Sequence, residues 1–283
     1  MNCIFCHKIS DNSKSVEHII PESLGNKKHT LWKGAVCDKC NNYFAVKIEK
    51  KLLEQPYFKN VRHRRDIYTK KGHSVPQIVL LSTDNGWKNA VLDFNEKRGN
   101  SIYFENDEDF APLMSEGKII VPLLLEPESN NYILSRFLAK CAFEYMALLF
   151  DNTENISRDA IIDFLREKQF DAIRKYARYG EGEKLWKYNQ RRIYGEDVRF
   201  IDKNENNGQP YEVLHEMCLF IDKSTVSESN DIFYAETYFA IVIMGIEFVI
   251  NVGENEIENY QSWLKRNNYK SPITRNYEQQ VSA

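Results

Sequence analysis

The 283-residue sequence has little of several features that mark special classes of protein. Only 12 glycines and 8 prolines are present, with no repeat, which excludes a collagen-like chain or one disordered throughout. The strongest apolar run, Tyr238–Ile246, is about half of the ~20 residues that a membrane-spanning helix needs. The start, Met1–Cys6, has no basic stretch before an apolar one, so we expect no secretory signal. We therefore expect a cytoplasmic globular protein without a membrane partner.

The formal net charge of −3 conceals an uneven distribution of charge along the chain. Residues 1–73 hold 15 basic and 7 acidic side chains, a balance of +8, whereas the other residues hold 23 basic and 34 acidic ones. A basic first third on an acidic body indicates that this third meets a polyanion such as nucleic acid. Alternatively, the uneven charge distribution arises by chance from a Lys- and Asn-rich composition.

The hydrophobic pattern predicts an α+β fold, with a small N-terminal module followed by a larger mixed domain. Phe44, Ile48 and Leu52 recur every four residues and predict a helix, with Pro56 as its stop. Strands are expected at 77–82, 90–94, 101–104, 118–125, 211–221, 232–244 and 246–252, and further helices at 133–150, 157–167, 170–179 and 256–265. The expected domains are 1–58, a basic linker at 59–74, and 75–283.

Four of the six cysteines form two CxxC pairs, Cys3 with Cys6 and Cys37 with Cys40. In a reducing compartment this spacing favours metal binding over disulfides, and two such pairs are typical of a tetrahedral zinc site. The 30 residues between the pairs exceed the usual insert, but the longer loop costs only about 0.5 kcal/mol of closure entropy. We therefore predict structural Zn²⁺ bound by these four thiolates.

The segment between and after the cysteine pairs carries a recognisable motif. It contains Glu-His-Ile-Ile-Pro at Glu17–Pro21, a glycine at Gly25, and Cys-Asn-Asn at Cys40–Asn42. In this order, and bracketed by CxxC pairs, these residues resemble the HNH, or ββα-metal, endonucleases. The resemblance covers residues 1 to about 55.

The resemblance implies a metal-dependent nuclease and assigns three residues to its chemistry. His18 stands at the position of the general base that activates water, and Glu17 and Asn41 stand at the positions of the ligands of the catalytic cation. Their oxygen atoms suit Mg²⁺ or Mn²⁺ better than Zn²⁺. Since neighbouring residues of a regular strand point to opposite faces, Glu17 and His18 converge only if the strand bends or ends there.

Two features of the expected site stay open. The family has a middle Asn that orients the general base, and Asn26, His29 or a main-chain carbonyl could fill its role here. Asn42 and Glu49 share a helical stripe and could add a contact behind the metal ligands, but for Glu49 we expect a solvated face.

Contacts to nucleic acid are expected from the basic segment after the module. Its candidates are Arg62, Arg64, Arg65, Lys70 and Lys71. A second basic and aromatic cluster between Arg174 and Arg192 either contacts phosphates and bases or forms a solvated face.

The C-terminal domain carries no catalytic motif that we can identify. It could recognise the target, bind a regulatory ligand or partner protein, or form a homodimer that pairs two nuclease heads. By analogy, such an arrangement is typical of bacterial defence or restriction. DNA is the expected substrate, with RNA as an open alternative. The other function class is a zinc-binding nucleic-acid module without catalysis.

Overall fold

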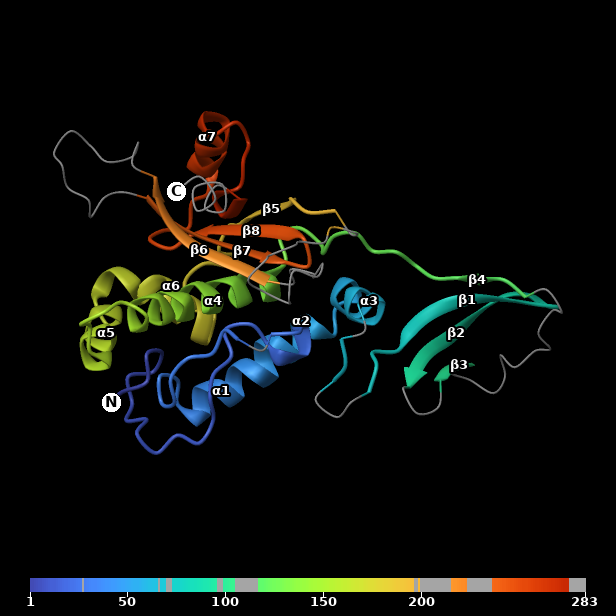
Figure 1. Cartoon of the computed structure of the whole chain (residues 1–283), viewed down its shortest axis with the longest axis horizontal. Helices are drawn as coiled ribbons and strands as arrows, with labels where there is room; N and C mark the ends of the chain where they lie inside the picture. Colours follow the sequence, from blue (N-terminus) through green and yellow to red (C-terminus); the bar gives the residue numbers. More distant parts are fainter. Residues whose placement is uncertain are drawn as a thin grey trace, which may run out of the picture. The chain divides into compact units, whose positions relative to one another are not determined.

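The computed structural model describes residues 1–26, 28–65, 67–69, 73–95, 99–104, 117–195, 198, 215–222 and 236–274. As predicted, the fold is α+β, with helices and two antiparallel four-stranded sheets (Figure 1). The chain divides into two compact units. Unit 1 comprises Met1–Ile20, Asn26–Lys50 and Glu128–Ala283, and unit 2 comprises Pro21–Gly25 and Lys51–Pro127. These units do not follow the boundaries expected at residues 58 and 74.

A nearly continuous helical run follows the second cysteine pair. It consists of α1 (Asp38–Phe44), a π-helical turn η2 (Ala45–Glu49) and α2 (Lys50–Leu53), which runs into unit 2. The apolar residues of the predicted stripe are all fully buried. The helix ends before Pro56, and that proline then opens a further helix, α3 (Pro56–Arg64). The front of the expected basic linker is therefore helical.

The sheet of unit 1 has the strand order β5-β8-β7-β6. Its strands are β5 (Asn189–Arg192), β6 (His215–Asp222), β7 (Glu236–Ile243) and β8 (Ile246–Asn251). The two-residue turn between β7 and β8, Met244 and Gly245, has φ values of 52° and 84°. Two positive φ angles are the requirement of the type I′ hairpin turn, which explains the glycine at the second position.

Helices cover both faces of this sheet (Figure 1). On one face, Tyr238 contacts Tyr260 of α7 (Glu258–Arg266). On the other, Phe239 contacts Tyr145 of α4 (Tyr132–Asp151), with the ring centroids 5.6 Å apart. Burial on both faces explains why β7 is apolar without alternation from Tyr238 to Ile243 and why β8 is apolar except at Glu247 and Asn251.

Helices α5 (Arg158–Leu165) and α6 (Asp171–Tyr179) pack against α4, and the short turn η4 (Lys168–Phe170) precedes α6. The ends of the two helices follow their sequence signals. The Ser157 side chain accepts a hydrogen bond from the Ala160 amide at the start of α5. Gly180 ends α6 in the left-handed conformation.

Unit 2 contains the second sheet, in the order β3-β2-β1-β4. Its elements are η1 (Glu22–Leu24), α3, β1 (Gln77–Thr83), β2 (Gly86–Asn95), β3 (Gly99–Tyr103) and β4 (Ile119–Ile120). The core is small, with Val79, Leu81 and Ala90 at its centre. Asn60 links α3 to the rest of the unit through Gln77 and the main chain at Pro122 and Leu124.

Two strand predictions need correction. The segment expected as a strand at 118–125 pairs only at Ile119 and Ile120. The sequence analysis did not predict strand β5. The beginnings of two expected strands, 211–214 and 232–235, lie outside the described residues. No helix in the described part of the chain is long and apolar enough to cross a membrane.

Candidate functional site

The two cysteine pairs meet at one point in unit 1. The first turn closes when the His7 amide donates to the Cys3 carbonyl (2.9 Å), and Cys37 caps the start of α1. The four Sγ atoms all lie within 4.8 Å of one another, and those of Cys6 and Cys37 are 3.6 Å apart. The predicted cluster is confirmed.

The cysteine cluster fits a tetrahedral zinc ion. With Zn–S bonds of about 2.3 Å, neighbouring sulfurs of a tetrahedral site lie about 3.8 Å apart. A hydrogen bond from Cys40 lowers the pKa of Cys3 to about 5. Arg178 of α6 donates through Nε to Cys40 Sγ at 3.1 Å, so the sulfur cluster has a buried cationic neighbour.

A short hairpin brings Glu17 and His18 to the centre of the module. The Leu31 amide donates to the Glu17 carbonyl (3.0 Å), and the Ile19 amide donates to the His29 carbonyl (3.1 Å). His18 pairs with Thr30 in an isolated bridge, after which the chain bends. The regular strand therefore ends at His18, as convergence of Glu17 and His18 requires.

Asn26 closes the loop of this hairpin. Its buried side chain donates to the carbonyls of Ile20 (2.7 Å) and His29 (3.1 Å) and accepts from the amides of Lys28 and His29. Of the candidates for the middle Asn, Asn26 thus holds the main chain on either side of the loop. His29 takes part through its backbone.

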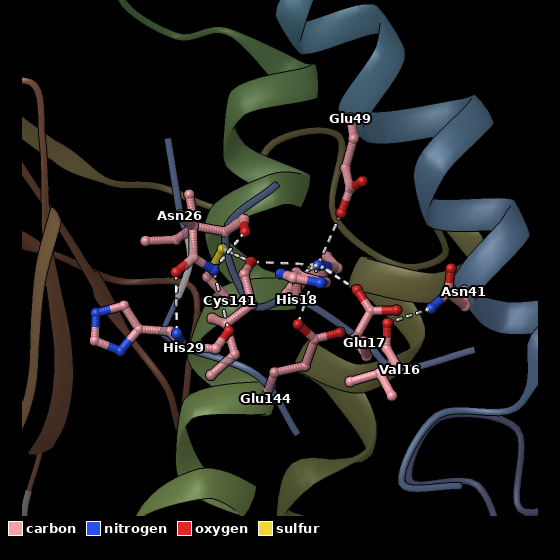
Figure 2. Close-up of polar contacts among 12 residues, drawn as sticks. Val16, Glu17, His18, Asn26, His29, Asn41, Glu49, Cys141 and Glu144 are labelled. Carbon is pink, nitrogen blue, oxygen red and sulfur yellow. Dashed lines mark hydrogen bonds and ion pairs between the residues drawn. The ribbon is translucent and has the colours of Figure 1, made fainter. Parts of the chain in front are cut away.

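Asn41 lies in the first turns of α1, beside the hairpin. Its amide nitrogen donates to the carbonyl of Val16 at 3.4 Å, one residue before Glu17 (Figure 2). Asn41 and His18 are both partly exposed. Asn41 of α1 thus lies beside the part of the hairpin that carries Glu17 and His18.

A buried lysine from α4 occupies the centre of this group. The Nζ atom of Lys140 lies 2.7 Å from Glu17 Oε1, 2.9 Å from Glu49 Oε1 and 3.1 Å from Glu144 Oε2. It also donates to the carbonyls of His18 (3.0 Å) and Ile19 (3.3 Å). Lys140 and Glu144 are fully buried, and Glu17 is 4% exposed.

The expectation for Glu49 was wrong, because its carboxylate is half-buried and paired with Lys140. Glu49 is the last residue of the π-helical turn, and one extra residue in a helix shifts the following side chains around the axis. An ideal α-helix would align Asn42 with Glu49, as the sequence analysis assumed. The π turn changes that register.

Burial and ion pairing have opposing effects on the pKa values in this cluster. It raises the pKa of Glu17 to about 7, against the opposing effect of Lys140, and it also raises that of Glu144. Burial lowers the pKa of Lys140, but the carboxylates of Glu144, Glu17 and Glu49 outweigh it and keep the ammonium charged.

Glu17 and Asn41 offer oxygen ligands of the kind that Mg²⁺ or Mn²⁺ prefers. Oε2 of Glu17 is buried and has no hydrogen-bond partner among the described residues. A buried acceptor in this state is unsatisfied, and a hard cation would satisfy it. The Glu17 carboxylate therefore fits as a ligand of the expected catalytic cation, and Asn41 stays a predicted second ligand.

The expected nucleic-acid contacts belong to unit 2 or fall outside the described residues. Arg62 is 6% exposed, so its guanidinium does not lie on the surface. Arg64 is engaged by Asn60 and the Leu124 carbonyl, and Arg65 is partly exposed. Lys70 and Lys71 lie outside the described part of the chain.

In the second basic cluster the arginines Arg174 and Arg178 are buried, while the lysines lie on the surface. Arg174 contacts His7 and Asp171, and Arg178 contacts Cys40. Lys187 and Arg191 pair with glutamates. Arg174 and Arg178 thus serve the fold and the cysteine cluster, whereas Lys175 and Lys187 are exposed, as the interpretation of a solvated face expects.

Sequence reasoning missed Lys140, Glu144 and Arg178 as parts of the site. The available signal was weak: Lys140 and Glu144 lie four residues apart in the centre of a largely apolar helix, which also contains Arg136. An isolated charge pair in such a helix indicates buried ionic partners, because an unpaired buried charge is too costly.

Comparison with known proteins agrees with the N-terminal motif. Residues 3–57 match a family model described as HNH endonuclease. The match contains the four cysteines, Glu17, His18 and Asn41, and it ends before the basic segment. No curated protein and no solved structure matches the chain.

Proposed function

We propose that the protein is a metal-dependent endonuclease that hydrolyses DNA phosphodiester bonds. The observation that supports this most is the contact of Asn41 with the hairpin that carries Glu17 and His18, beside the four-cysteine cluster and within the segment similar to HNH endonucleases. The same analogy favours a role in bacterial defence or restriction.

Each residue has a role that its chemistry supports. His18 is partly exposed and carries the side chain whose ordinary pKa lies nearest to neutral pH, so it accepts the proton of the attacking water. Glu17 and Asn41 hold Mg²⁺ or Mn²⁺ through oxygen. When bound, that cation stabilises negative charge on the phosphate and on the leaving oxygen. The four cysteines hold Zn²⁺ and keep the two halves of the module together.

The excess of 8 positive charges in residues 1–73 favours a nucleic-acid substrate. Among the described site residues, no contact distinguishes DNA from RNA, so an RNA substrate is tested in parallel. A homodimer that pairs two heads would convert nicks into double-strand breaks, and a regulatory ligand or partner protein is the alternative role of the C-terminal region.

The test is cleavage of supercoiled plasmid with Mg²⁺ or Mn²⁺, with wild type beside His18→Ala. We expect conversion to nicked or linear plasmid by wild type and none by His18→Ala, with zinc content and DNA binding unchanged. His73→Ala, which removes an exposed histidine outside the site, is the matched control and retains cleavage. Equal cleavage by wild type and His18→Ala would contradict the proposal.

A second function is favoured by one contact: the Lys140 ammonium lies on the Glu17 carboxylate. If Lys140 replaced the divalent cation, the module would bind nucleic acid through its fold and charge without cutting it. In that case wild type and His18→Ala would bind DNA equally and neither would cleave it under any of the metal conditions.

A further inference from the structure

Helix α4 reaches the loop of Glu17 and His18 through two neighbouring side chains. Lys140 pairs with the Glu17 carboxylate and donates to the carbonyls of His18 and Ile19. The Cys141 thiol donates to the Ile19 carbonyl as well, at 3.1 Å. Two consecutive residues of α4 thus hold three consecutive residues of the hairpin.

The two carbonyls bound by Lys140 define the shape of the main chain. In a regular strand, successive carbonyl groups point in opposite directions. Those of His18 and Ile19 both reach one Nζ atom, so the chain departs from the strand geometry between them. Lys140 therefore fixes the bend that allows Glu17 and His18 to serve the same site.

The carboxylates around Lys140 are arranged for an ammonium ion. Among the described residues, the cysteine cluster is the one group of three or more potential ligands close enough together to hold a metal. Glu17, Glu49 and Glu144 do not meet that condition, although each lies within 3.1 Å of Nζ. The lysine is the cation that these three side chains share.

Lys140 engages only one oxygen of Glu17. Oε1 pairs with Nζ, while the buried Oε2 has no hydrogen-bond partner among the described residues. A carboxylate fixed through one oxygen presents the other in a constant direction, which is how an outer partner orients a metal ligand.

We propose that Lys140 is a positioning residue of the nuclease site, holding Glu17 through Oε1 and the bend after His18 so that Oε2 is presented to the divalent cation. This inference rests on the proposed nuclease function. It also adds to the family motif a residue from outside the matched segment.

Lys140 could instead replace the divalent cation at Glu17. The two roles of Lys140 predict changes of opposite sign in metal affinity when the lysine is removed. Removal of a positioning lysine weakens Mn²⁺ binding because Glu17 and the bend lose their support. Removal of a competing lysine strengthens Mn²⁺ binding because Glu17 is freed. The sign of the change therefore separates the two roles.

The experiment measures Mn²⁺ binding by electron paramagnetic resonance and plasmid cleavage, on the full chain loaded with Zn²⁺. Lys140→Met leaves three buried carboxylates without a cation, so this variant can fail to fold. The triple variant Lys140→Met, Glu49→Gln, Glu144→Gln removes that excess charge and leaves Glu17. The matched control is Lys175→Met, which breaks an exposed lysine–carboxylate pair on α6.

We expect the folded triple variant to bind Mn²⁺ at least tenfold more weakly than wild type and to lose kcat with little change in KM for DNA. Hydrogen exchange at the Ile19 amide should accelerate at least tenfold. Lys175→Met should behave as wild type in each assay.

Two outcomes would overturn the inference, and they are distinguishable. If wild type cleaves and the triple variant binds Mn²⁺ equally or more tightly, the positioning role is wrong while the nuclease function stands. If wild type neither binds Mn²⁺ beyond the zinc site nor cleaves, the nuclease function is wrong and the positioning role falls with it.

Discussion

The contact between Arg178 and Cys40 gives the sharpest prediction for the cysteine cluster. Arg178 donates through Nε to Cys40 Sγ at 3.1 Å, and its guanidinium carbon lies 3.8 Å from the centroid of the Tyr43 ring. Four thiolates around Zn²⁺ carry a net charge of −2, which a buried guanidinium stabilises. We expect Arg178→Met to weaken zinc binding.

The magnitude follows from the type of contact. A hydrogen bond to a charged group contributes about 1.5–3 kcal/mol, and each 1.4 kcal/mol is a factor of about ten in affinity. The zinc affinity of Arg178→Met should therefore fall by about 10- to 100-fold, which is the range found for outer partners of metal ligands. Arg178→Lys keeps the charge without the Nε–H donor and should lie between the two.

The assay is competition for zinc with a chelator of known affinity at fixed pH. Arg158→Met is the matched control, because Arg158 also lies over an aromatic ring, that of Trp32, but its guanidinium pairs with Asp151. Tyr43→Leu removes the stacked ring and leaves the Nε–H···S contact. It should lower the melting temperature while zinc affinity stays within about threefold. A zinc affinity of Arg178→Met within about threefold of wild type would refute the reasoning.

Two further predictions concern the scaffold of the site. Asn26→Ala removes the buried amide that closes the hairpin loop and should reduce the free energy of unfolding by about 2–4 kcal/mol in urea titrations, whereas the exposed Asn42→Ala should have little effect. Phe143→Ala opens a cavity beside Phe5, whose ring centroid lies 5.2 Å away, and should cost about 3–5 kcal/mol. The exposed Leu149→Ala on the same helix is its control, and equal losses in the two variants would contradict a core shared by α4 and the N-terminal module.

The elements predicted most closely are those with strong local signals. Helix α4 follows from a long apolar pattern, and α6 ends where Gly180 permits a left-handed residue. The β7–β8 hairpin follows from two apolar runs around Gly245. Each of these signals lies within the element that it specifies, so one sequence is sufficient to find it.

The elements that escaped prediction depend on distant partners. Strand β5 reads Asn-Gln-Arg-Arg and has no apolar alternation of its own. It is a strand because it pairs with β8, where Arg191 lies opposite Glu247 and forms an ion pair with it. Tertiary context of this kind overrides local propensity.

The same distinction between local signals and distant partners explains which parts of the candidate site could be predicted from the sequence. The cysteine spacing and the Glu17–His18 pair are local, and the structure brings the cysteines together as expected. Glu49 was misjudged because its partner, Lys140, lies about ninety residues further along the chain and because a π turn changes the helix register. The sequence around Glu49 indicates neither the distant partner nor the π turn.

The segment similar to HNH endonucleases ends at residue 57, but its side chains contact residues much further along the chain. Phe5 packs on Phe143, Cys40 accepts from Arg178, and Glu17 pairs with Lys140. These contacts supply apolar cover, a cation for the cysteine cluster and a cation for the hairpin, all from α4 and α6. The cysteine pairs, Glu17, His18 and Asn41 therefore belong to the same compact unit as residues 128–283, and side chains of α4 and α6 complete the surroundings of the candidate site.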